Sequence, residues 1–173
     1  EEVLLEQLAG VERIDYIVSH HTEQDHSGAI PKVLEIHPEA TVVCSPKAQS
    51  LLIDHVGIEA ERIKTVEDGE TLSLGDKTLR FVHTPWVHWP ETMVSYLEED
   101  RILFTCDLFG SHLATSNLYA SSEPYVMEGA KRYYAEIMMP FRKILINNLK
   151  KIRGLELELI APVHGPIYDR PEG

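Results

Sequence analysis

Short apolar runs alternate along the chain with segments that have the period of an amphipathic helix. The runs predict strands over residues 14–19, 41–44, 62–66, 71–74, 78–83, 93–97, 102–106 and 157–160. Helical spacing is found in residues 28–37, from Pro46 onward, and in 123–153, where Pro140 should divide one helix into two. Residues 1–8 have the pattern of the last part of an amphipathic helix. Strands and helices mixed in this way predict an α/β architecture in layers.

The chain shows no internal repeat, no low-complexity linker and no evident boundary between domains. Gly75 with Asp76, and the acidic run 98–100, are typical of the turns of β-hairpins between the central strands. With 173 residues the chain is long enough to bury a hydrophobic core, so we expect one domain over residues 1–173.

The chain is strongly acidic, with 16 Lys and Arg against 28 Asp and Glu and a formal net charge of −12. Such a charge disfavours binding to nucleic acid or to an anionic membrane surface. No apolar stretch reaches the length of a membrane span and no signal peptide is visible, so we expect a cytoplasmic protein. Cys44 and Cys106 lie inside apolar runs and are interpreted as buried thiols of a reducing compartment.

The densest group of chemically active side chains is segment 21–26, with the sequence HTEQDH. It directly follows the first predicted strand and offers four potential metal ligands, His21, Glu23, Asp25 and His26. In an extended segment His21, Glu23 and Asp25 point to one side, because alternate side chains share a face. A single ion rarely needs so many donors from one short loop, so the spacing indicates two ions side by side. A solvated polar loop would have the same composition and stays open as the alternative.

Three further candidate ligands, His88, Asp107 and His164, stand at or just past the ends of other apolar runs. Open α/β architectures gather their site residues at the carboxyl ends of strands. Ligands that come from separate segments are fixed in position by tertiary folding, as a preformed metal site requires. Their positions therefore favour a metal site over a solvated loop.

In this arrangement the sequence resembles the metallo-β-lactamase superfamily and, within it, the flavodiiron proteins. The common hydrolase signature is H-x-H-x-D-H, whereas segment 21–26 has the flavodiiron variant H-x-E-x-D-H, with Glu23 in place of the second histidine. The resemblance covers residues 14–168 and includes His88-Trp89-Pro90, LFTCDLFG at 103–110, AKRYYA at 130–135 and His164-Gly165. A carboxylate in place of an imidazole makes the site harder, which favours iron or manganese over zinc.

The resemblance implies an α/β fold of the metallo-β-lactamase type, an αββα sandwich. Two departures from the family pattern accompany it. The strands that normally open this domain are missing before Glu1, and no flavodoxin-like domain or FMN phosphate-binding loop occurs within the chain. We therefore expect residues 1–173 to be a fragment of a larger flavodiiron protein, with FMN bound by the intact protein and not by this chain alone.

The resemblance also implies the ligands of two iron ions. One iron would be held by His21, Glu23 and His88, and the other by Asp25, His26 and His164, with Asp107 bridging the pair. In some flavodiiron proteins the imidazole equivalent to His26 turns away and water takes its place. Tyr134 is the side chain expected to lie closest to a bound gas molecule.

As a function, the resemblance implies reduction of dioxygen to water, or of nitric oxide to nitrous oxide, at the two irons. The electrons would come from FMN. A rubredoxin or a coenzyme-linked flavin reductase would supply the flavin, and the flavin would meet the diiron site of the second subunit in a head-to-tail homodimer.

Two other functions remain open on the sequence. A flavin-free diiron protein with the same ligands would bind oxygen as a sensor, and the absence of a flavodoxin-like segment favours it. A dinuclear zinc hydrolase of the same superfamily would use its metals to activate hydroxide. Glu23 and the His88-Trp89-Pro90 context are evidence against the hydrolase.

Overall fold

The computed structural model describes residues 2–171, and the chain divides into two compact units, residues 1–66 and 67–173. The sequence around Val66 contains no linker rich in Gly, Pro or Ser, so composition gives no sign of this division. Each unit has its own β-sheet and its own hydrophobic core. None of the helices formed by residues 2–171 has both the length and the apolarity that crossing a membrane requires.

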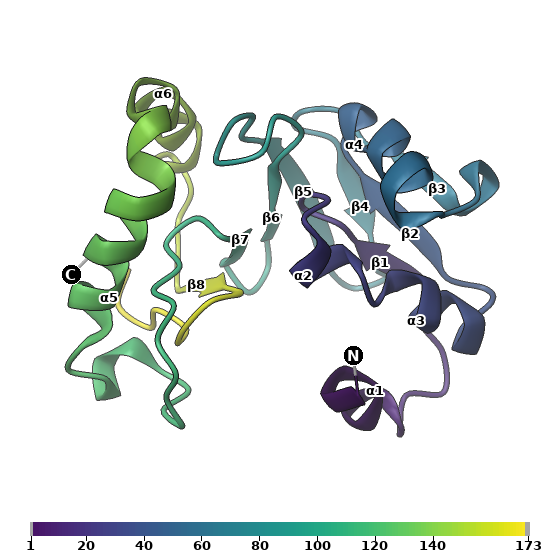
Figure 1. Cartoon of the computed structure of the whole chain (residues 1–173), viewed down its shortest axis with the longest axis horizontal. Helices are drawn as coiled ribbons and strands as arrows, with labels where there is room; N and C mark the ends of the chain where they lie inside the picture. Colours follow the sequence, from purple (N-terminus) through teal and green to yellow (C-terminus); the bar gives the residue numbers. More distant parts are fainter. Residues whose placement is uncertain (1, 172–173) are drawn as a thin grey trace. The chain divides into compact units, whose positions relative to one another are not determined.

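The first unit contains a parallel three-stranded sheet with the strand order β1-β2-β3 (Figure 1). Its elements are α1 (Glu2–Leu8), β1 (Tyr16–Val18), α2 (Gln24–Ser27), α3 (Ile30–Ile36), β2 (Thr41–Cys44), α4 (Pro46–Leu51), the π-helical turn η1 (Leu52–Val56), the 3-10 turn η2 (Ala60–Arg62) and β3 (Ile63–Thr65). Pro46 is the first residue of α4, which confirms the predicted start of that helix.

Helices α3 and α4 cover one face of this sheet. Val42 and Cys44 are alternate residues of the central strand β2, and they pack in one cluster with Ile30 and Leu34 of α3 and Ala48 of α4. All five side chains are buried, and Val42, Cys44 and Ala48 are fully enclosed. Burial of this apolar surface is what stabilises the parallel strand pairing.

Burial raises the pKa of the Cys44 thiol to about 12. Because the thiolate is the reactive form, we expect Cys44 to remain unmodified when the folded protein meets iodoacetamide at mildly alkaline pH. The same cysteine should react fully in denaturant, which serves as the control. Peptide mass mapping measures both, and equal labelling of Cys44 with and without denaturant would contradict its position in the core.

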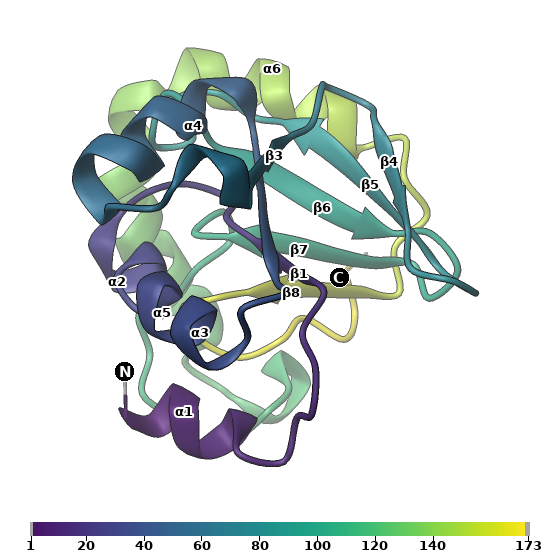
Figure 2. The ribbon, with the colours of Figure 1, turned by 90° about the vertical axis from the view of Figure 1, so that its right-hand side faces the viewer.

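The second unit contains a five-stranded sheet in which the strands lie side by side in sequence order, β4 to β8 (Figure 2). Its elements are β4 (Thr71–Ser73), β5 (Thr78–His83), β6 (Met93–Leu97), β7 (Ile102–Cys106), the 3-10 turn η3 (Ala120–Ser122), α5 (Val126–Tyr133), the π-helical turn η4 (Tyr134–Met138), the 3-10 turn η5 (Met139–Phe141), α6 (Arg142–Ile152) and β8 (Leu159–Pro162). Strands β4 to β7 are antiparallel neighbours, whereas β8 is parallel to β7. A parallel pair needs a long crossover, and the helices between β7 and β8 supply it.

Helices α5 and α6 pack on one face of this second sheet. Val94 and Leu103 of the sheet lie in one core cluster with Tyr133, Leu145 and Ile152 of the helices. The predicted break at Pro140 is confirmed, because this proline lies in η5, directly before α6. The crossover thus brings β8, and the segment after it, to the end of β7.

Candidate metal centre

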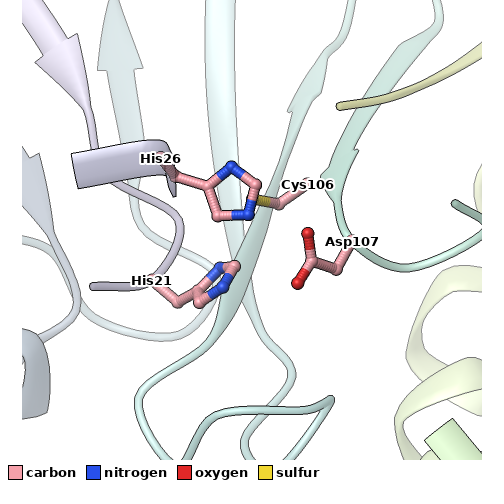
Figure 3. Close-up of side chains that lie close together, drawn as sticks. All are labelled: His21, His26, Cys106 and Asp107. Atoms are coloured by element: carbon pink, nitrogen blue, oxygen red, sulfur yellow. The ribbon is translucent and has the colours of Figure 1, made fainter. Parts of the chain in front are cut away.

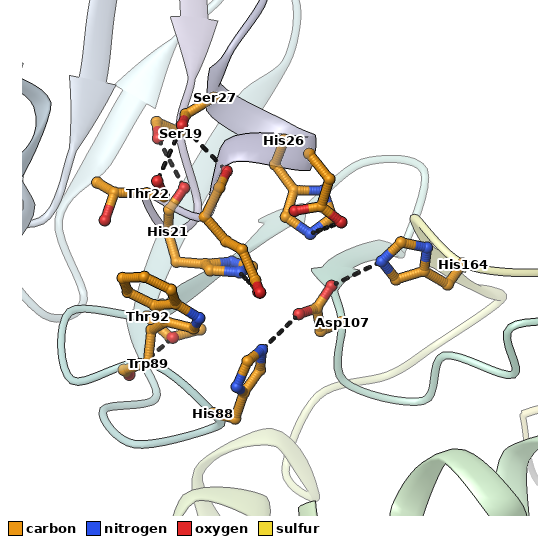
Figure 4. Close-up of polar contacts among 12 residues, drawn as sticks. Ser19, His21, Thr22, His26, Ser27, His88, Trp89, Thr92, Asp107 and His164 are labelled. Atoms are coloured by element: carbon orange, nitrogen blue, oxygen red, sulfur yellow. Dashed lines mark hydrogen bonds and ion pairs between the residues drawn. The ribbon is translucent and has the colours of Figure 1, made fainter. Parts of the chain in front are cut away.

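In the first unit the predicted ligand segment 21–26 follows β1, and two serines fix its backbone. The Ser19 hydroxyl donates to the carbonyl oxygen of His21 (3.1 Å), and the Ser27 hydroxyl donates to those of Thr22 (2.9 Å) and Glu23 (3.0 Å). These contacts are drawn in Figure 4. The backbone of the loop is therefore held by side chains that are not themselves candidate ligands.

Within this loop the imidazoles pair with carboxylates. His21 Nε2 lies 3.3 Å from Glu23 Oε2, and His26 Nε2 lies 3.4 Å from Asp25 Oδ2. The two imidazole rings meet edge to face, with their centroids 4.7 Å apart. The loop thus gathers nitrogen and oxygen donors, a mixture that suits iron or manganese.

His20, directly before this segment, is partly buried. Burial, followed by the neighbouring His21 and His26 imidazoles, lowers the pKa of His20 to about 4. The side chain is therefore neutral at pH 7 and adds no positive charge that would oppose a bound cation.

In the second unit the carboxylate of Asp107 lies between two imidazoles. Its Oδ2 is 3.0 Å from His88 Nε2, and its Oδ1 is 3.4 Å from His164 Nε2 (Figure 4). Asp107 is only 2% exposed. A carboxylate that presents each oxygen to a different imidazole has the orientation that a ligand shared by two metals needs.

Sheet topology explains why these three side chains meet. Asp107 directly follows β7 and His164 follows β8, and the carboxyl ends of parallel strands lie at one edge of a sheet. His88 lies in loop 84–92 between β5 and β6, which returns the chain to that edge because β6 is antiparallel to β7. In this unit the three predicted ligands therefore lie together at one edge of the sheet, and their binding of metal stays a prediction.

Unusual backbone conformations concentrate beside these residues. Of the five non-glycine residues with positive φ in the described chain, four lie within five positions of His88 or Asp107: Trp86 (63°), Cys106 (52°), Phe109 (69°) and His112 (39°). Left-handed conformations are unfavourable for residues with a Cβ atom, and they cluster at functional sites. The distribution of strain thus supports the surroundings of Asp107 as the candidate site.

The segment that carries His164 is tied to the chain beyond Asp107 at Ser111. The backbone N–H of Ser111 donates to the carbonyl oxygen of His164 (2.8 Å). Gly165 has a φ of 100°, and a Cβ atom there would lie 1.9 Å from Ser111 Oγ. Glycine is required at this position because no side chain fits between the two segments.

Two residues that are not among the predicted ligands lie against His164. The ring of His112 is 4.3 Å from that of His164, and the ring of the buried Tyr133 is 6.1 Å away. Tyr134, predicted to lie nearest a bound gas, is partly buried against the core cluster that contains Tyr133. Its role stays a prediction.

Cys106 directly precedes the candidate ligand Asp107 in the sequence. Figure 3 labels this cysteine and the neighbouring Asp107 of the second unit. Cys106 and Cys44 are both buried and free of disulfides, which confirms their interpretation as core thiols. In the sequence, only its position next to Asp107 links Cys106 to the candidate site.

Both the sequence and the structure have known relatives. The model of the family described as "ODP family beta lactamase" matches residues 3–165. A nitric oxide reductase of Moorella thermoacetica is 36% identical over 173 residues, which cover 98% of this chain and 43% of that protein.

Solved structures agree with the sequence comparison. The flavodiiron protein of Giardia intestinalis matches with a TM-score of 0.92 at 32% identity, over 98% of this chain and 43% of that chain. The rubredoxin oxygen:oxidoreductase of Desulfovibrio gigas matches with a TM-score of 0.91 at 32% identity, over 95% of this chain and 43% of that chain. These likenesses confirm the predicted α/β fold of the metallo-β-lactamase type. The chain spans about two fifths of the length of these relatives.

Proposed function

The chain belongs to the ODP family of beta lactamases, and we propose that it is the diiron-binding part of a flavodiiron oxidoreductase. The observation that carries the proposal is the buried carboxylate of Asp107, whose oxygens face His88 Nε2 and His164 Nε2 at 3.0 and 3.4 Å. A buried carboxylate placed between two imidazoles offers one oxygen to each of two metal ions. The resemblance supplies the remaining ligands residue by residue.

The donor set fits iron. One iron is assigned to His21, Glu23 and His88, the other to Asp25, His26 and His164, with Asp107 shared. Four imidazoles and three carboxylates, without a thiolate, form a harder set than the closed cysteine-rich sites of structural zinc. The carboxylates also offset part of the positive charge of two divalent ions.

When bound, the two irons supply the redox chemistry that reduces dioxygen or nitric oxide. The protein's part is to hold and orient the ligands. His164 is restricted by the neighbouring His112 and Tyr133 rings, and its backbone is tied to Ser111. We place Tyr134 closest to the bound gas.

The remaining parts of the reaction belong to the whole protein. FMN in a flavodoxin-like domain would deliver the electrons, and a rubredoxin or a coenzyme-linked flavin reductase would reduce that flavin. The names of the relatives pair rubredoxin with oxygen in one case and specify nitric oxide in another, so both gases are candidate substrates. We expect a cytoplasmic head-to-tail homodimer.

Metal content and gas consumption test this function. After anaerobic loading with ferrous iron we expect about two irons per chain, and an optical change when oxygen is admitted. The whole protein should then consume oxygen or nitric oxide with reduced rubredoxin as the donor. Stoichiometric zinc that iron cannot displace, with no response to oxygen, would overturn the proposal in favour of a hydrolase. Reversible oxygen binding without turnover would indicate a sensor instead.

A further inference from the structure

Asn148 is a polar residue in an otherwise apolar stripe of α6. The buried residues of this helix are Leu145, Asn148 and Ile152, and Asn148 is 5% exposed. A buried amide is unfavourable unless its hydrogen bonds are satisfied, so such a residue calls for a partner. Asn148 Nδ2 donates to the carbonyl oxygen of Pro85 at 2.9 Å, across 63 positions of sequence.

Pro85 belongs to loop 84–92, which carries His88. The backbone N–H of Thr84 donates to the Thr92 carbonyl oxygen (2.9 Å) and closes the base of the loop. Inside it the N–H of Trp86 donates to the Trp89 carbonyl oxygen (2.7 Å). These bonds stabilise the loop internally, but they do not attach it to another element of the unit.

The attachment comes from α6. One turn beyond Asn148, Lys151 Nζ donates to the His83 carbonyl oxygen (2.8 Å) and to Asp68 Oδ2 (2.8 Å). Asp68 Oδ1 in turn accepts the backbone N–H of His83 (2.8 Å). Helix α6 therefore holds the end of β5 through exposed hydrogen bonds from Lys151, and it holds the start of the loop through a partly buried hydrogen bond from Asn148.

We propose that Asn148 is a positioning residue for His88. Its amide fixes the Pro85 carbonyl, three residues before His88, and so sets the direction in which the imidazole approaches Asp107. The Trp86 ring stacks on Phe141, directly before α6, with centroids 6.2 Å apart, and strengthens the same attachment. The inference rests on the proposed function, because it concerns one of the proposed iron ligands.

Two variants at position 148 test this role, with a neighbour as the matched control. Asn148→Leu keeps the size and suits the apolar stripe, while Asn148→Asp keeps the shape and loses the N–H donor. The control is Asn147→Leu, because Asn147 is an exposed asparagine of the same helix whose Oδ1 accepts a hydrogen bond from Lys150 Nζ. All three are compared with the wild type for folding by circular dichroism.

The first readout is amide hydrogen exchange of loop 84–92 in the metal-free protein. We expect faster exchange at Thr84 and Trp86 in both Asn148 variants and no change in Asn147→Leu. The second readout is the iron dissociation constant, which should rise about 10- to 100-fold in the Asn148 variants, as for other residues that orient a metal ligand.

Unchanged exchange together with unchanged iron affinity would overturn the inference. A lower melting temperature alone, with both readouts unchanged in the folded protein, would also overturn it, because Asn148 would then be purely structural. If the wild type itself binds no iron, the proposed function fails, while the exchange experiment still decides whether Asn148 anchors the loop.

Discussion

Replacing Asp107 by asparagine should abolish stoichiometric iron binding. The substitution keeps the size of the side chain but removes its negative charge and turns an acceptor towards one imidazole into an N–H donor. Asp107 is proposed as the ligand of both irons, so neither site should survive intact. Loss of a residue that merely orients a ligand costs about 10- to 100-fold in affinity, and loss of a shared ligand should cost at least about 100-fold.

Anaerobic titration with ferrous iron, followed by elemental analysis, measures this effect. Asp76→Asn is the matched control. Asp76 lies on the exposed turn between β4 and β5, and its replacement removes the same negative charge. The control should bind iron like the wild type. An Asp107→Asn protein that is folded by circular dichroism and still binds iron with wild-type affinity would show that the ligand assignment is wrong.

The sequence predicts the strands well and singles out the candidate ligands, because both depend on local patterns. A run such as Val42 to Cys44 is apolar because its strand is buried, so burial can be read from composition alone. His88, Asp107 and His164 are visible because they stand at or just past the ends of apolar runs, where α/β architectures gather their site residues. The α/β class follows from the order of these elements.

The features that the sequence does not predict depend on contacts between distant segments. The bond from Asn148 to Pro85 joins residues 63 positions apart, and no local pattern marks asparagine as a partner of a loop. The division after Val66 is likewise a property of the tertiary contacts and not of a linker. Positive φ at Cys106 is imposed by the turn into Asp107, since nothing about cysteine favours that conformation.

Gly165→Ala should be the most destabilising of the small substitutions near His164. The new Cβ atom would lie 1.9 Å from Ser111 Oγ, and the residue would keep a φ of 100° that alanine disfavours. The conformational cost is about 1–2 kcal/mol and overpacking adds about 1–3 kcal/mol, so the free energy of unfolding should fall by about 2–5 kcal/mol. For a chain of this size the melting temperature should fall by an amount on the order of 10 °C.

Thermal unfolding of a double-mutant cycle separates the two costs. Ser111→Ala removes the hydroxyl that the new Cβ atom of residue 165 would meet. The Cβ atom of residue 111 then lies 3.3 Å from the new Cβ atom. In the double mutant the overpacking part of the stability lost in Gly165→Ala should therefore be regained. The part due to positive φ should persist. Gly154→Ala is the control, because a Cβ atom there meets nothing within 4 Å, and its effect should stay within about 0.5 kcal/mol. Purely additive effects of Ser111→Ala and Gly165→Ala would mean that the Ser111 hydroxyl does not crowd the new methyl group, and that the whole loss in Gly165→Ala comes from the positive φ of residue 165.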